Sequence, residues 1–187
     1  MKIKTITYAL TGLGLAGALL QNAPAAPKEK PSPEIEAKLT EVIKSSYPDV
    51  VITKMGKETE DGLSFVEVAF TTKGVKMDAD VMEDGTLVET EQAADIKTFP
   101  EPAAKALKKA TKGMKIVVTE IATTYAKAAP GDTSGTKVVK LAEPIIAYEA
   151  DVEKDGKKGE FSISAEGSIL ESPKWAKSGE KESEDKD

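Results

Sequence analysis

The chain has 187 residues and a formal net charge of −6 at pH 7, and it contains neither histidine nor cysteine. Its 26 basic residues are all lysine. The acidic balance disfavours nucleic acid and anionic membranes as partners. The missing histidine and cysteine exclude the commonest general base, the commonest metal ligand and any disulfide. Without arginine, no planar guanidinium is present to bind a phosphate or carboxylate at two points.

Residues 1–25 have the pattern of a secretory signal peptide. Two lysines give a basic start, Ile6–Leu20 is an apolar run, and Ala23-Pro24-Ala25 ends it with small residues. We expect cleavage after Ala25, because cleavage after Ala23 or after Ala26 would leave a proline just beyond the scissile bond. The apolar run is shorter than the ~20 residues of a membrane-spanning helix, so a retained anchor is the weaker alternative. The sequence predicts an exported protein, periplasmic or secreted, with no membrane insertion after signal cleavage.

A proline-rich linker at residues 26–32 precedes the first predicted helix. Ser32 is a favourable N-cap, and Pro33 suits the first helical position because the N–H that it lacks would be unpaired there. Tyr47-Pro48 ends the helix, since proline disfavours helical geometry in the residue before it. Apolar residues recur between these points with helical spacing, at Ile35, Leu39, Val42 and Ile43.

Four antiparallel strands are predicted after this helix. Turn signals at Asp61-Gly62, Lys73-Gly74 and Asp84-Gly85 separate alternating segments, which is the pattern of a β-meander. The third strand alternates strictly, so one of its faces is predicted to be apolar and the other polar. The predicted strands are Val50–Thr59, Leu63–Thr71, Val75–Val81 and Thr86–Glu91.

A second helix and strand group is predicted from about Thr98. Thr98-Phe99-Pro100-Glu101 suggests a capping box, and a slightly later start with Pro102 at the first helical position is the alternative. A longer loop, Ala128–Thr136, takes the place that the Asp61-Gly62 turn has in the first group. Pro144 interrupts the next strand, which suits an edge or a bulge. The apolar helix positions are Ala103, Leu107 and Ala110, the strand segments are Met114–Tyr125, Val138–Leu141 and Ile145–Val152, and the later turns are Asp155-Gly156 and Glu166-Gly167.

The two groups repeat one another in sequence. Val66–Glu89 aligns without gaps with Tyr148–Glu171, and two glycines and several charged residues coincide. A repeat of this length indicates two copies of one supersecondary unit. We therefore expect an α+β fold of two tandem helix-plus-four-strand antiparallel meander repeats, at 33–95 and 96–171, with the helices packed on one face of the sheet. Residues 172–187 are predicted to form a disordered charged tail.

These motifs, in this order, resemble the PepSY-like domains. The features are Phe99-Pro100-Glu101 before Ala-Leu-Lys-Lys, strands separated by Lys-Asp-Gly-Lys-Lys, and a closing Asp-Gly or Glu-Gly turn with an aliphatic pair. More narrowly, Pro33–Glu171 resembles, as two tandem copies, the PepSY-like proteins described as similar to β-lactamase inhibitor proteins. The resemblance implies an α+β fold with helices on one face of an antiparallel sheet. It also implies an exported non-catalytic protein that binds or inhibits peptidases or other enzymes.

Acidic residues are the main candidates for chemistry, and their spacing along the chain does not support a site. Asp78, Asp80 and Asp84 with Glu83 do not match the ligand ladder of a calcium loop. Acidic pairs on the strands could do acid–base work, but a solvated sheet surface with interspersed lysines explains them more simply. We therefore predict no catalytic, cofactor-binding or metal-binding residue, and no enzymatic activity. The pairs considered are Glu67/Asp78 and Glu149/Glu160.

The sheet face opposite the helices is the predicted recognition surface, expected to meet solvent or a partner. Ala128–Pro144 and Tyr148 make the second repeat the favoured place for specificity, and Trp175 is expected to dock back on the domain. The predicted function is an exported binding module that inhibits or regulates a peptidase or other envelope enzyme through an unknown protein partner. A structural or assembly domain of the cell envelope is the alternative. The predicted outward residues are Glu67, Lys76, Asp78, Asp80, Glu149, Asp151, Lys158 and Glu160.

Overall fold

The computed structural model describes residues 28–60 and 62–177. The predicted signal peptide, Asp61 of the first turn and residues 178–187 of the predicted tail lie outside the described residues. The elements in chain order are α1 Pro33–Ser46, β1 Val51–Glu60, β2 Leu63–Thr72, β3 Val75–Val81, β4 Leu87–Ala93, the 3₁₀ turn η1 Ile96–Thr98, α2 Glu101–Ala110, β5 Lys115–Ala128, β6 Val138–Lys154, β7 Lys157–Ile163, β8 Ile169–Glu171 and β9 Ala176–Lys177.

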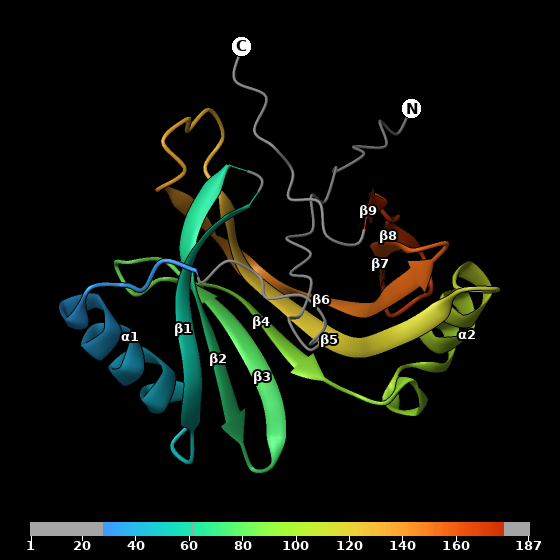
Figure 1. Ribbon diagram of the computed structural model, residues 1–187, viewed down its shortest axis with the longest axis horizontal. Helices are drawn as coiled ribbons and strands as arrows, with labels where there is room; N and C mark the ends of the chain where they lie inside the picture. The colour runs from blue at the N-terminus through green and yellow to red at the C-terminus, as the bar shows by residue number, and fades with distance from the viewer. Residues whose placement is uncertain (1–27, 61, 178–187) are drawn as a thin grey trace, which may run out of the picture.

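The strands form one antiparallel sheet in which β1 to β8 lie side by side in chain order, and β9 pairs with β7. The pairing of β4 with β5 joins the strands that follow α1 to the strands that follow α2. Figure 1 shows the sheet bent into a saddle, with both helices on the outside of the bend. The expected α+β fold, with two helices and an antiparallel sheet, is confirmed.

Each helix buries its apolar stripe against the outer face of the sheet. Leu39 and Ile43 of α1 are fully buried in the first cluster, and Ala103 and Leu107 of α2 are fully buried in the second. Removing apolar surface from water is the main force that holds both helices on the sheet. The buried strand partners are Val66, Val68, Phe70, Met77, Ala79 and Val81 in the first cluster and Ala150, Val152, Phe161 and Ile163 in the second.

The first helix begins and ends where the sequence predicts. Ser32 is the N-cap, and its hydroxyl accepts a hydrogen bond from the Ile35 N–H at 3.4 Å. Pro33 is the first helical residue, and Tyr47 is the C-cap. Local capping chemistry is enough to fix these limits.

The capping box predicted for the second helix does not form. The Thr98 hydroxyl instead donates to the Asp95 carbonyl oxygen at 2.8 Å, within η1. Pro100 is left as the N-cap with no side-chain hydrogen bond, and α2 starts at Glu101 with Pro102 in its first turn. The prediction was wrong because the threonine hydroxyl already has a partner in the preceding turn.

Two of the predicted hairpin turns have the same backbone conformation. Lys73 and Gly74 have φ values of 50° and 79°, and Asp155 and Gly156 have φ values of 52° and 72°. Two successive positive φ values match the type I′ turn, whose twist suits the flanking strands. These turns connect β2 to β3 and β6 to β7.

The strands β5 and β6 extend past their neighbours as an arm, residues 126–146. The arm's loop is held by the Asp132 carboxylate, which accepts backbone N–H bonds from Ser134, Thr136 and Lys137 at 2.9–3.1 Å. The Ser64 N–H donates to the Gly135 carbonyl oxygen at 2.7 Å, so the loop contacts the start of β2. Pro144 lies in a bulge of β6, as predicted: the pairing with β5 runs from Thr124–Ile145 to Ala126–Lys140 and skips residues 141–144. The described pairing of β6 with β7 begins only at Tyr148, so this proline is also at an edge.

Candidate functional site: the carboxylate face

Acidic side chains line the inner face of the bent sheet, opposite the helices. Residues directly opposite each other in an antiparallel pair point to the same face, and in this register carboxylates oppose carboxylates on strand after strand. Asp80, for example, lies opposite Glu67 of β2 on one side and Glu89 of β4 on the other. We call this surface the carboxylate face. Its members are Glu58, Glu67, Asp78, Asp80, Glu89, Glu91, Glu120, Glu149, Asp151 and Glu160.

The residues predicted to point outward do lie on this face, but several of them are buried. The exposed fraction is 1% for Asp80, 6% for Glu149 and 7% for Glu67. The prediction of a solvated surface is therefore wrong for these three residues. Alternation along a strand shows which face a side chain occupies, but it does not show how far the sheet bends around that face (Figure 1).

Burial raises the pKa of most of these carboxyl groups. Loss of water around the charged form is the largest cause throughout, and neighbouring carboxylates add to it at Asp78, Glu120 and Glu149. For the same two reasons, the pKa values of Asp80 and Glu91 lie well above the ordinary range. The pKa is about 6 for Asp78 and Asp151, about 7 for Glu89 and Glu120, and about 8 for Glu149.

Some members of the face have polar partners. Lys28, from the segment before α1, pairs with Glu58 and with Glu67, whose Oε2 lies 2.7 Å from the Lys28 Nζ. The Thr124 hydroxyl donates to Glu89 Oε1 at 2.7 Å. The Lys28 ammonium group therefore neutralises part of the charge at the β1–β2 end of the face.

Other members lack a polar partner. Within the described residues, neither carboxylate oxygen of Asp80 or of Glu91 has a hydrogen-bond partner. Ionising a buried carboxylate without compensation is costly. These groups must therefore hold a proton or meet a cation that arrives from outside the described chain.

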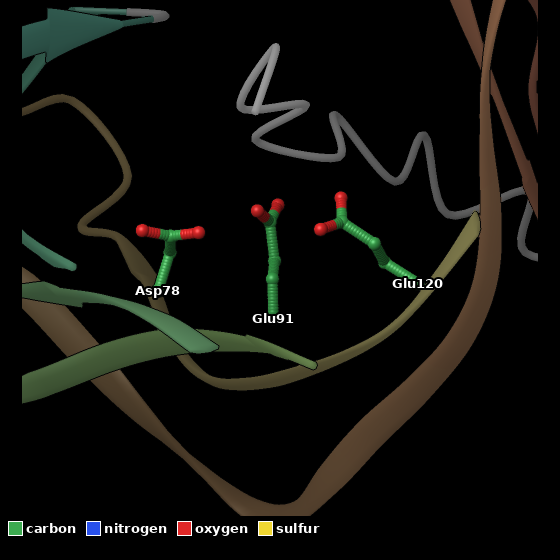
Figure 2. A group of neighbouring side chains, drawn as sticks. All are labelled: Asp78, Glu91 and Glu120. Carbon is green, nitrogen blue, oxygen red and sulfur yellow. The ribbon is translucent and has the colours of Figure 1, made fainter. Parts of the chain in front are cut away.

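Three carboxyl groups gather at the centre of the face. Asp78 of β3 lies opposite Glu91 of β4, and Glu120 of β5 lies opposite Ala93, one step along the same face. One oxygen from each of Asp78, Glu91 and Glu120 lies within 4.8 Å of the others. Figure 2 shows the three side chains in a row, rising from neighbouring strands to the same side of the sheet.

A pocket of about 570 Å³ opens at the β1–β2 end of the face. Acidic side chains line it together with the apolar side chains of Phe65 and Met82. Lys57 also lines the pocket, and its Nζ forms an ion pair with Glu83 Oε1 at 2.8 Å. The acidic residues of the lining are Glu29, Glu58, Glu83 and Asp84.

The calcium-loop residues considered from the sequence are not brought together as a group. Asp84 accepts the Thr86 N–H at 2.7 Å in the β3–β4 turn, and this bond is the first cause that lowers its pKa. Glu83 pairs with Lys57, whereas Asp78 and Asp80 lie on the carboxylate face. The members of the carboxylate face that sequence reasoning missed are Glu58, Glu89, Glu91 and Glu120. The alternation of Glu89 and Glu91 along β4 is the signal that could have pointed to an acidic inner face.

Two aromatic residues singled out from the sequence have packing roles. The ring of Tyr148 lies 5.0 Å from the ring of Phe99, centroid to centroid, in the cluster under α2. Tyr148 is therefore part of the outer core and does not supply specificity on the inner face. A Cβ atom placed on Gly159 of β7 would lie 3.3 Å from Trp175 Cε3, so one edge of the Trp175 ring lies against β7, while 39% of this residue remains exposed.

Comparison with solved structures shows the same fold in bacterial proteins. A BLIP-like protein from Bacteroides fragilis superposes with a TM-score of 0.50 at 16% identity, covering 84% of this chain and 92% of that chain. A Bacteroides eggerthii protein, described provisionally as periplasmic, superposes with a TM-score of 0.50 at 13% identity, covering 78% of this chain and 88% of that chain. No protein-family model matches the sequence, and no curated protein is detectably similar to it.

The helices of the described residues are too short or too polar to cross a membrane.

Proposed function

We propose that this chain is an exported, non-catalytic binding module of the PepSY-like type. In this proposal two tandem repeats, 33–95 and 96–171, follow a signal peptide that is cleaved after Ala25. The element order supports the repeat, because α1 is followed by β1–β4, α2 is followed by β5–β8 and the two-residue β9, and the equivalent β2–β3 and β6–β7 hairpins share one turn type. The neighbours called BLIP-like and provisionally periplasmic support a binding role and export.

The acidic pocket at the end of the carboxylate face is the observation that carries the proposal. Its carboxylates would receive the charged end of a lysine or arginine, and Phe65 and Met82 would cover the aliphatic stem of that side chain. The buried carboxyl groups beyond the pocket have raised pKa values, so the charge that meets a partner comes mainly from the acidic residues of the pocket itself. The partner is therefore a protein that presents a basic segment, and the module regulates or inhibits that partner, a peptidase or another envelope enzyme, by occupying it.

Charge reversal in the pocket tests this function. Glu83→Lys is expected to weaken the complex at least ~10-fold, because a rim carboxylate that meets a basic side chain becomes a repelling ammonium. Glu41→Lys is the matched control, since Glu41 is exposed on α1 and the change in net charge is the same. Basic exported proteins are captured on the purified wild-type chain, and the dissociation constant of each is measured by calorimetry at two salt concentrations.

The salt dependence and the control decide the outcome. A partner bound through this pocket should bind more weakly at higher salt and should lose affinity only with Glu83→Lys. A partner that binds both variants equally, without salt dependence, would contradict the pocket as its docking site. If the partner is an enzyme, its turnover with and without the wild-type chain separates inhibition from simple attachment.

A second candidate function, assembly into an envelope structure, is favoured by the free edge of β6. The strand β7 pairs with β6 only from Tyr148 onward, so residues 138–140 and 145–147 pair with β5 on one side and with no strand of the described chain on the other. Val139 and Ile146 in this stretch are 53% and 51% exposed. Exposed apolar strand edges favour pairing with another chain unless charge or proline protects them. Lys140, Glu143 and Pro144 protect the middle of this stretch, so pairing would use the segments around Val139 and Ile146.

Sedimentation separates this candidate from the first. If the β6 edge mediates self-assembly, the wild-type chain should form oligomers at micromolar concentration, and Ile146→Lys should return it to a monomer. If the wild-type chain remains monomeric under the same conditions, the proposal of assembly through this edge is wrong. Glu83→Lys serves as the control, because it lies outside the arm and should not alter the oligomeric state.

A further inference from the structure

The central acidic cluster has the geometry of a cation site. Asp78, Glu91 and Glu120 come from three neighbouring strands, β3, β4 and β5, and each presents an oxygen within 4.8 Å of the other two. Two oxygens that bind one calcium ion at 2.3–2.6 Å can be at most about 5 Å apart. The spacing of the three carboxylates therefore accommodates a shared calcium ion without movement of the strands (Figure 2).

The surroundings of Glu91 are an independent indication of a cation site, because no described protein group pairs with its buried carboxylate. Glu91 is 2% exposed, and within the described residues neither of its oxygens has a hydrogen-bond partner. The charged groups that act on it most strongly are all carboxylates, namely Glu149, Glu120, Glu89 and Asp80. The lysines Lys28, Lys54 and Lys76 act on the cluster at Asp78, and Lys28 is engaged with Glu58 and Glu67. A cation between Asp78, Glu91 and Glu120 would supply the partner that Glu91 lacks.

We propose that Asp78, Glu91 and Glu120 bind one calcium ion at the centre of the carboxylate face. The three carboxylates supply up to six oxygens if each binds through both atoms, which meets the lower end of calcium coordination. A purely oxygen donor set suits a hard cation, whereas copper and zinc favour the imidazole and thiolate donors of histidine and cysteine, which this chain lacks. Two oxygens on opposite sides of one magnesium ion lie at most ~4.2 Å apart. Oxygens of the cluster that lie near the 4.8 Å limit would therefore have to move closer together to bind magnesium.

The calcium site goes beyond the proposed binding function and does not depend on it. The cluster lies on β3, β4 and β5, whereas none of its residues lines the pocket that contains Glu83. Calcium binding is measured on the purified chain without any partner, and partner binding is measured with Glu83→Lys. Failure of one experiment therefore leaves the result of the other intact.

The test combines calorimetry and thermal unfolding of the purified protein after treatment with a chelator. Calcium chloride is expected to bind with a dissociation constant of about 10⁻⁴–10⁻³ M, the range of extracellular calcium modules, and to raise the melting temperature. Glu91→Gln keeps the shape of the side chain but removes its charge. Affinity for calcium should fall by ~100-fold or more, since loss of an outer-shell group alone already costs about 10–100-fold.

The matched control is Glu160→Gln, which removes a carboxylate from the same face but outside the cluster. This variant should retain the calcium-induced rise in melting temperature. Asp78→Asn is the second ligand variant, and it should lose the rise as Glu91→Gln does. The proposal is overturned if calcium leaves the wild-type chain unchanged, or if Glu91→Gln and Asp78→Asn respond as fully as Glu160→Gln. Equal stabilisation by magnesium would overturn the assignment to calcium.

Discussion

Replacing Phe70 by alanine is expected to lower the free energy of unfolding by about 3–5 kcal/mol. Phe70 is 2% exposed in the cluster under α1, and its ring lies 5.1 Å from the Tyr47 ring, centroid to centroid. Truncation removes the transfer energy of the ring and leaves a cavity between α1 and the sheet, which tightly packed neighbours refill only in part. Urea unfolding followed by circular dichroism measures the change.

The second core provides the matched comparison. Leu107→Ala under α2 is expected to cost about 2–5 kcal/mol, because Leu107 is also fully buried. Val51→Ala is the surface control and should change stability by less than about 0.5 kcal/mol. Since β4 and β5 pair along the middle of one sheet, both core variants should shift a single cooperative transition. Two separate transitions, with Phe70→Ala affecting only one, would show that the two clusters unfold independently.

The local parts of this fold could be predicted from sequence because their causes are local. Ser32 and Pro33 define the start of α1 through capping chemistry, and Lys73-Gly74 and Asp155-Gly156 define hairpins through their backbone preferences. The start of α2 could not be predicted as well, because Thr98 had two competing partners and the sequence does not show which one it takes.

The carboxylate face could be predicted only in part. Strand alternation placed Glu67, Asp78, Asp80 and Glu149 on the face opposite the helices, and that placement agrees with the register. Several of them are buried, and burial depends on packing between distant parts of the chain, which no local pattern encodes. The meeting of Asp78 with Glu91 and Glu120 depends on the register of three strands, so residues far apart in the chain had to be aligned before the cluster could be seen.

Acidification is expected to stabilise this protein between about pH 8 and pH 5, contrary to the usual behaviour of paired carboxylates. Burial raises the pKa of Glu149 to about 8 and that of Asp151 to about 6. A carboxyl group whose pKa is higher in the folded state contributes its full stabilisation below the unfolded pKa, because the folded protein then retains the neutral form. That contribution is lost as the pH rises through the folded pKa, so the free energy of unfolding should fall across this window.

Glu149→Gln isolates one part of the effect. The amide remains neutral at every pH, so the variant should be about 1–3 kcal/mol more stable than the wild type near pH 8, and the two should converge near pH 5. Glu41→Gln on the exposed surface of α1 is the control, with an expected change below about 0.5 kcal/mol. Urea unfolding at several pH values measures the difference in the free energy of unfolding between the variant and the wild type. A chelator is included so that no bound cation contributes.

The direction of the slope distinguishes a buried acidic face from a solvated one. If these carboxylates were exposed and paired with lysines, stability would be constant or would rise with pH over the same interval, and Glu149→Gln would be neutral or destabilising. Below about pH 4 the trend should reverse, because groups such as Asp132, whose pKa its hydrogen bonds to Ser134 and neighbouring N–H groups lower to about 2, lose their stabilising charge. A maximum of stability on the acidic side of neutrality is therefore the signature expected of a sheet that gathers its carboxylates inside its bend.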